Sequence, residues 1–307
     1  MAEGDSPVIA RRRVRLALRE AREAVPLTQA QVAEAMEWSL SKVIRIESGD
    51  VTISINDLRG VLSLLDVSDR AIVDSLVADA RVSRIRPKVQ PAWWMSPRFD
   101  DVLADALRQL LEYESEATAI RSFNLLFVPG PLQTPAYGAA LTNPWVEELG
   151  DEFSQTRVQV LVEARQRRRE ALLARPGSFK YFILIDQSVL MRPIGGIEVF
   201  ADQLRLIVEL SSQAMFQIRM LPFDLSIAIA NNGSFDLLTV GADAREGDVL
   251  YRENGVYDQL VENRAEVARH RDRFEQLWSA ADSESDTITF IKKRMEALEK
   301  NSPEARG

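Results

Sequence analysis

The sequence predicts a mostly α-helical protein with an all-α five-helix domain at its N-terminus and a larger α+β domain, with a small sheet and a C-terminal helical segment. Two observations favour this fold class: a length of 307 residues with 46% hydrophobic content, and apolar residues at helical spacing through most of the chain. We expect the first domain at residues 1–82, a linker at 83–98 with three prolines, and the second domain at 99–307.

Composition excludes several classes of function. The chain has no cysteine, so disulfides, thiolate metal sites and cysteine nucleophiles are excluded. We find no export signal and no apolar run of about 18 residues, so we expect a soluble cytoplasmic protein that makes no contact with a membrane. The sequence also lacks a nucleophile paired with a base, a glycine-rich phosphate loop and a metal-ligand cluster. We therefore expect no enzyme activity, no metal and no cofactor.

Charge is distributed unevenly along the chain. Residues 1–90 carry 14 Lys and Arg against 13 Asp and Glu, whereas residues 91–307 carry 24 against 33. The net charge of −8 therefore arises in the second domain. Because the first domain is only weakly basic, binding to nucleic acid would depend on a few placed cations and on dimerisation.

The stretch 28–49 predicts two short helices joined by a tight turn. Thr28 and Gln31 have the Thr-x-x-Gln pattern of a capping box, and Ser39 can cap the second helix after a turn at residues 37–38. Further helices are predicted at 8–24, 54–65 and 68–81. This order predicts a helix-turn-helix domain, in which the second helix of the pair enters a DNA major groove.

The predicted second helix has one buried face and one face for DNA. Val43 and Ile46 share the apolar face. The side chains expected to point outward are Leu40, Ser41, Lys42 and Arg45. Arg45 is our candidate for a guanine contact, with Leu40 and Ser41 reading neighbouring base edges or a thymine methyl group.

This region resembles the repressor-type helix-turn-helix family, also called the XRE or lambda-repressor-like family. The matching residues are Arg22-Glu23, Leu27-Thr28-Gln29, Val32-Ala33, Trp38-Ser39, Ser41-Lys42-Val43, Arg45-Ile46-Glu47 and Gly49. The resemblance implies that Gln29 grips a phosphate, that the positions of Ser39, Leu40, Ser41 and Arg45 face base edges, and that Lys42 lies near the DNA backbone. It also implies a structural ion pair between Arg22 and Glu47.

Two residues depart from the family pattern. Glu37 occupies a turn position where the family usually has glycine, and a left-handed conformation there would cost roughly 1 kcal/mol. Ile44 stands where serine is common, which places an apolar group near the DNA or a neighbouring helix.

From about residue 93 onward the chain resembles the domain of unknown function found in actinobacterial regulators of the WhiJ-like type. The matching residues are Glu114, Glu116-Ala117, Ile120, Val128-Pro129-Gly130, Leu132-Gln133-Thr134, Tyr137, Arg165-Gln166, Asp186, Leu190, Gly195-Gly196, Gln203-Leu204, Leu221-Pro222 and Gly233-Ser234-Phe235. The resemblance implies an antitoxin-like association with a small partner protein.

The second domain has an α+β pattern. Helices are predicted at 99–121, 153–174, 197–211, 257–281 and 285–299, with a short helix after Asp186, and strands at 179–185, 216–222, 233–240 and 248–253. The arginine run 165–169 is interpreted as a solvated helix face with ion pairs one turn apart, for example to Glu163 and Glu170.

The sequence leaves open whether the second domain binds a ligand. Trp93 and Trp94 either line a pocket or pack domains together, and Gln133, Thr134 and Tyr137 are either caps or the rim of a pocket. We therefore hypothesise a homodimeric, sequence-specific regulator that binds double-stranded DNA. The alternatives are an antitoxin-like interaction protein that binds a small protein and regulates its own operon, and a ligand-gated repressor.

Overall fold

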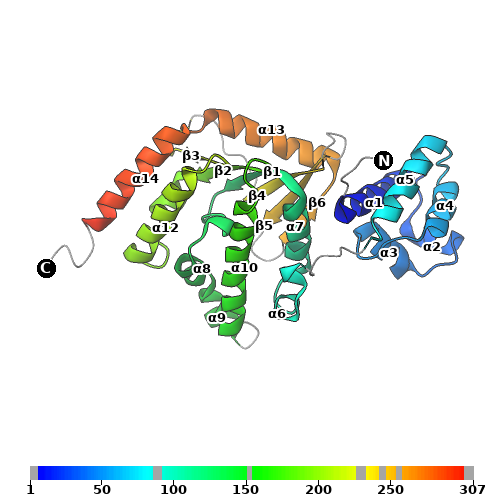
Figure 1. The fold of residues 1–307 in the computed structure, drawn as a ribbon, viewed down its shortest axis with the longest axis horizontal. Helices are drawn as coiled ribbons and strands as arrows, with labels where there is room; N and C mark the ends of the chain where they lie inside the picture. The colour runs from blue at the N-terminus through cyan, green and yellow to red at the C-terminus, as the bar shows by residue number, and fades with distance from the viewer. Residues whose placement is uncertain are drawn as a thin grey trace. The chain divides into compact units, whose positions relative to one another are not determined.

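The computed structural model describes residues 6–85, 92–150, 154–225, 233–241, 247–253 and 258–300. The chain forms two compact units, Met1–Gln90 and Pro91–Gly307 (Figure 1). Each unit has its own hydrophobic core. Within the segment 83–98, which we expected to be a linker, the described residues from Ala92 onward belong to the second unit. There Trp93–Met95 forms a short 3-10 helix, η1.

The described part of the first unit consists of five helices, as predicted. They are α1 (Pro7–Ala24), α2 (Gln29–Ala35), α3 (Leu40–Ser48), α4 (Ile55–Leu64) and α5 (Arg70–Val82). Apolar side chains from all five helices form one core, whose buried members include Val14, Leu18, Val32, Val43, Ile46, Leu58, Leu62, Leu76 and Val77. Burial of each large aliphatic side chain contributes about 1.5 to 3 kcal/mol, so this core is the main support of α3.

Polar side chains cap the start of each of the five described helices in this unit. The capping residues are Ser6, Thr28, Ser39, Ser54 and Asp69, each of which accepts a hydrogen bond from a backbone N–H in the first turn. Thr28 and Gln31 form the predicted capping box. The start of α5 was expected at Ser68 and lies one residue later, because the Asp69 carboxylate accepts from the N–H groups of Ala71 and Ile72 at 2.8 and 3.2 Å.

The second unit is built on a mixed sheet. Its described strands are β1 (Ala117–Asn124), β2 (Lys180–Asp186), β3 (Phe216–Leu221), β4 (Phe235–Val240), β5 (Asp248–Glu253) and β6 (Asp258–Val261), in the order β3-β2-β1-β4-β5-β6. Strands β1, β2 and β3 are parallel, whereas β4, β5 and β6 pair antiparallel. The parallel strands are connected by long helical segments, as parallel pairing requires.

Helices cover both faces of this sheet (Figure 1). The described helices are α6 (Pro97–Asp100), α7 (Asp105–Glu116), η2 (Gly130–Leu132), α8 (Pro135–Thr142), α9 (Pro144–Leu149), α10 (Gln155–Leu173), α11 (Gln187–Met191), α12 (Ile197–Ser211), α13 (Arg264–Ala280) and α14 (Glu284–Glu299). Helix α13 lies on one face, where Arg121 of β1 pairs with Glu275 at 3.2 Å. Helices α7, α10 and α12 lie on the other face. No described helix is long and apolar enough to cross a membrane.

Two predicted helices are partly strands. Residues 117–121, expected to end a helix that began at 99, form the start of β1, and the helical part divides into α6 and α7. Strand β1 lies at the centre of the sheet and pairs with β2 and β4, so tertiary pairing overrides the local helical period. Residues 258–261 form the edge strand β6, and α13 begins only at Arg264.

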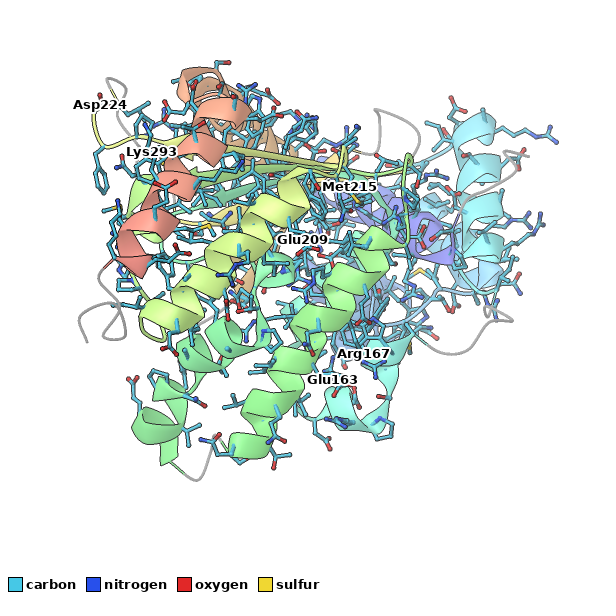
Figure 2. All side chains as sticks on the ribbon, turned by 60° about the vertical axis from the view of Figure 1, so that its left-hand side comes forward. Glu163, Arg167, Glu209, Met215, Asp224 and Lys293 are labelled. Carbon is cyan, nitrogen blue, oxygen red and sulfur yellow. The ribbon has the colours of Figure 1, made fainter. Side chains whose placement is uncertain are left out.

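The arginine run on α10 is not the solvated face we expected. Arg168 is buried and forms an ion pair with Glu114 of α7, with Nη2 to Oε2 at 2.7 Å. Arg165 donates to the Thr142 hydroxyl at 2.9 Å. The predicted pair between Glu163 and Arg167 does form, one turn apart at 2.8 Å, and Glu163 also pairs with Arg98 of α6 at 2.7 Å (Figure 2). The run therefore packs α10 against its neighbours.

Candidate nucleic-acid interface

The turn between α2 and α3 is a tight helix C-cap. The Trp38 N–H donates to the Ala33 carbonyl at 2.8 Å, and the Glu37 N–H donates to the Glu34 carbonyl at 3.1 Å. This is the Schellman pattern, which requires a left-handed residue after the helix. Glu37 takes that conformation with φ +56°. The turn therefore forms without glycine, at a cost of roughly 1 kcal/mol.

Helix α3 buries one face and exposes the other. Val43 and Ile46 are buried in the core, as predicted. The exposed side chains are Leu40, Ser41, Ile44 and Arg45. Ser39 is the N-cap, and its hydroxyl accepts from the Lys42 N–H at 3.2 Å. In helix-turn-helix proteins, the second helix of the motif contacts base edges. It does so with the exposed side chains of its first turn and of the next turn.

Lys42 is partly exposed, with 38% of its side chain accessible, and its ammonium group has two partners. Its Nζ lies 3.1 Å from the Asp57 carboxylate on α4 and 3.7 Å from the centre of the Trp38 ring. The attraction of the carboxylate and the aromatic face holds the ammonium group beside α4. Within the described part of the chain, no carboxylate pairs with the Arg45 guanidinium. Arg45 is thus the cation that α3 presents on its exposed face.

The buried Glu47 carboxylate links the end of α3 to α1 and to the start of α2. The Arg22 guanidinium on α1 donates to Glu47 through Nε at 2.7 Å and Nη2 at 2.9 Å, and it also donates to the Leu27 carbonyl at 3.0 Å. The side chain of Gln29, at the start of α2, donates to the same carboxylate at 2.9 Å. Hydrogen bonding to Glu47 raises the pKa of Arg22. The network sets the position of α3 relative to α1 and α2.

Gln29 therefore has a contact that the sequence did not predict. Its amide donates to the Glu47 carboxylate, so the same carboxylate positions both the Gln29 side chain and α3. Gln29 is also the first residue of α2, and the first N–H groups of a helix have no partner within the helix. That geometry suits a phosphate, because N–H groups and the helix dipole both favour an anion there.

Ile44 was recognised in the sequence only as a departure from the family pattern. Its side chain is 43% exposed and lies one turn from Leu40, which is 46% exposed. The spacing of four residues places both on one side of the helix. Exposed apolar groups beside Arg45 suit contacts with thymine methyl groups.

The other predicted site residues lie in the second unit. Tyr137 is buried, and its hydroxyl accepts from the Val128 N–H at 3.3 Å. Thr134 caps α8, and Gln133 donates to the Val128 carbonyl at 2.7 Å. Thr134 is therefore a cap, while Gln133 and Tyr137 hold the loop before α8 through Val128. Trp93 and Trp94 lie on η1 with ring centres 5.4 Å apart. Both pack against a hydrophobic cluster whose buried members are Phe99, Leu103, Leu111, Val160 and Ala164.

The five-helix fold of the first unit and the exposed face of α3 agree with a family match. Residues 14–76 match the family model described as "Helix-turn-helix domain", so this unit is a helix-turn-helix domain of the kind found in DNA-binding regulators. Residues 107–293, more than half of the chain, match the model described as "Domain of unknown function (DUF5753)", and the chain therefore belongs to the DUF5753 family. No curated protein and no solved structure matches the chain.

Proposed function

We propose that the protein is a sequence-specific transcriptional regulator that binds double-stranded DNA as a homodimer. The observation that supports it best is the exposed face of α3, in which Arg45 lies between apolar and hydroxyl side chains on a helix fixed by the core and by Glu47. In this proposal Arg45 donates to guanine, Ser41 and Ser39 contact neighbouring edges, and Leu40 with Ile44 contacts thymine methyl groups.

The phosphate contacts are few in this proposal. Gln29 and the N-terminal N–H groups of α2 bind one phosphate. Lys42, held beside Asp57, acts near the DNA backbone only if that ion pair opens. With a net charge near zero in residues 1–90, one domain would bind weakly. Two domains would read half-sites about 34 Å apart, one helical turn of DNA.

The second unit is proposed to provide dimerisation and control. On this view the chain is an XRE-type regulator of the cytoplasm, related to the actinobacterial WhiJ-like proteins. One observation favours an additional activity, because residues 91–307 carry 33 acidic against 24 basic residues. A domain with this net negative charge suits a small basic partner protein, as in an antitoxin-like pair.

Selection of bound sequences from a random double-stranded DNA pool tests the proposal. The full-length protein should enrich an inverted repeat whose half-site centres lie about one helical turn apart, and footprinting should protect both half-sites. Enrichment of a single, non-repeated site would contradict the homodimer. Enrichment of no sequence would contradict sequence-specific binding and leave the acidic second unit as the functional surface, to be tested by co-purification with and without nuclease.

A further inference from the structure

A cavity of about 100 Å³ lies within the second unit, between η1, α7 and the C-terminal end of α10. Its apolar walls are formed by Trp93, Trp94, Leu111 and Leu172. Ser115 and Ala171 also line it and are exposed to solvent, so the cavity opens at the surface between α7 and α10. A closed cavity of about 150 Å³ holds benzene. This cavity is smaller but open at the surface, so a single small ring would be enclosed in part and would reach out to the solvent.

The aromatic wall is held in place by its own contacts. Trp93 and Trp94 meet edge to face at 89°, and Trp93 packs edge to face on Phe99 with centres 4.9 Å apart. Arg167 lies over the Trp93 ring at 5.9 Å. Such pairs fix ring orientation, so the wall is formed before any ligand arrives.

The charged side of the cavity has an excess of one positive charge. Glu114 and Arg168 neutralise each other in a buried ion pair. Arg175 instead donates to two backbone carbonyls, those of Glu114 at 2.9 Å and of Ala117. Among the described residues no carboxylate lies within ion-pair distance of Arg175, although Glu116 acts on it from further away. Burial lowers the pKa of the Arg175 guanidinium, so its charge is incompletely solvated.

Two hydrogen-bond donors of the lining residues lack an acceptor among the described residues. The indole N–H groups of Trp93 and Trp94 are buried and have no hydrogen-bond partner among the described residues. An unsatisfied buried donor is unfavourable, and tryptophan N–H groups usually find a partner when buried. A ligand for this cavity would therefore provide acceptor atoms and negative charge together with an apolar body.

We propose that this cavity binds a small carboxylate with a single apolar ring. The ring lies between the Trp93–Trp94 wall and Leu111, and the carboxylate faces Arg175. The inference goes beyond the proposed DNA-binding function and does not depend on it. The site lies wholly within the second unit, so ligand binding and DNA binding can each fail alone.

Calorimetric titration of the full-length protein with benzoate tests the proposal, with benzyl alcohol and benzylamine as ligands that change only the polar group. For a ligand of this size we expect a dissociation constant on the order of 1 mM or lower for benzoate. Benzylamine should bind at least about tenfold more weakly, because its charge has the wrong sign for Arg175.

Two variants fill the cavity from its exposed rims without disturbing the core. Ala171→Leu and Ser115→Phe should each weaken benzoate binding at least about tenfold while the melting temperature stays near that of the wild type. Ala174→Leu is the matched control, because Ala174 is exposed at the end of the same helix and does not line the cavity.

Three results would overturn the proposal. One is the absence of benzoate binding up to about 10 mM, ten times the expected dissociation constant. Another is equal affinity for benzoate and benzylamine. The third is wild-type affinity for benzoate in both rim variants.

Discussion

At the scale of single residues, Glu47 is the group on which the position of α3 depends. It is 4% exposed and receives hydrogen bonds from Arg22 and Gln29, while its carbonyl accepts from Arg19 at 2.9 Å. One carboxylate thus joins the three helices α1, α2 and α3. Loss of its charge should lower stability and change the orientation of α3 relative to α1 and α2.

The variant Glu47→Gln should destabilise the first unit by about 2 to 4 kcal/mol, because the Arg22 guanidinium loses its buried partner. Denaturant unfolding measures this loss. Glu23→Gln is the matched control, since Glu23 is 61% exposed in its side chain and lies 3.7 Å from the same guanidinium. It should change stability by less than about 0.5 kcal/mol. Equal effects of the two variants would show that Glu47 is not the organising contact.

Glu37 tests the turn between α2 and α3. Its φ of +56° is unfavourable for a residue with a side chain, so Glu37→Gly should raise the free energy of unfolding by up to about 1 kcal/mol. The matched change Glu34→Gly lies inside α2 and should lower it by about 1 kcal/mol. Both effects are measured by denaturant unfolding. A destabilising Glu37→Gly variant would indicate that the side chain makes a contact that outweighs the strain.

At the scale of elements, the centre of the sheet carries a polar pair in which Ser122 is buried and Asp236 is half-buried. Ser122 of β1 donates to Asp236 of β4, and Asn124 donates to the Ser122 hydroxyl at 2.9 Å. Burial raises the pKa of Asp236 to about 6 from an ordinary value of 3.8. The folded state therefore binds the proton more tightly than the unfolded state does. The stabilisation is complete below about pH 4 and is lost as the pH rises through 6.

The variant Asp236→Asn removes this titration and keeps an acceptor for Ser122. At pH 7.5 it should stabilise the protein by about 1 to 2 kcal/mol, and near pH 4 the difference should disappear. Unfolding measured across pH 4 to 7.5 checks the trend. Asp202→Asn is the control, because Asp202 is an exposed carboxylate on α12. Its free energy of unfolding should match that of the wild type at each pH. If the advantage of Asp236→Asn were the same at every pH, titration of the Asp236 carboxylate would not be its cause.

The elements that could be predicted from sequence are those with local signals. Thr28, Ser39 and Ser54 cap helices within three residues of themselves, and Asp186 caps α11 in the same way. Strand β1 carries no such signal, because its conformation is determined by partners more than 60 residues away in sequence. Strand β6 is four residues long and pairs with β5 alone.

The candidate interface was predictable in part for the same reason. Helical spacing separates Val43 and Ile46 from Arg45, which identifies the exposed face. The contact between Lys42 and Asp57 spans 15 residues, and that between Glu114 and Arg168 spans 54. Nothing in a single sequence pairs these charges, so the ion pair of Lys42 was not predicted and Arg168 was wrongly expected to be solvated.

At the scale of the whole molecule, the helix-turn-helix unit and the DUF5753 unit have different charge. The acidic residues are concentrated in residues 91–307, so any field that attracts DNA must come from a few cations near α3. The affinity for DNA should then depend only weakly on salt. A plot of the logarithm of the binding constant against the logarithm of the salt concentration should have a slope of about −0.9 for each phosphate contacted, and we expect few such contacts. In the proposed function, specificity depends on the base contacts of α3.

The most direct test of that claim compares two arginine variants on the selected DNA site by fluorescence anisotropy. Arg45→Ala should weaken specific binding by about 1 to 3 kcal/mol and relax the preference at one base pair, with binding to unrelated DNA little changed. Arg70→Ala is the control, because Arg70 is 95% exposed in its side chain at the start of α5, outside the proposed interface. It should bind like the wild type. If Arg45→Ala kept wild-type affinity and base preference, α3 would not be the element that reads the DNA.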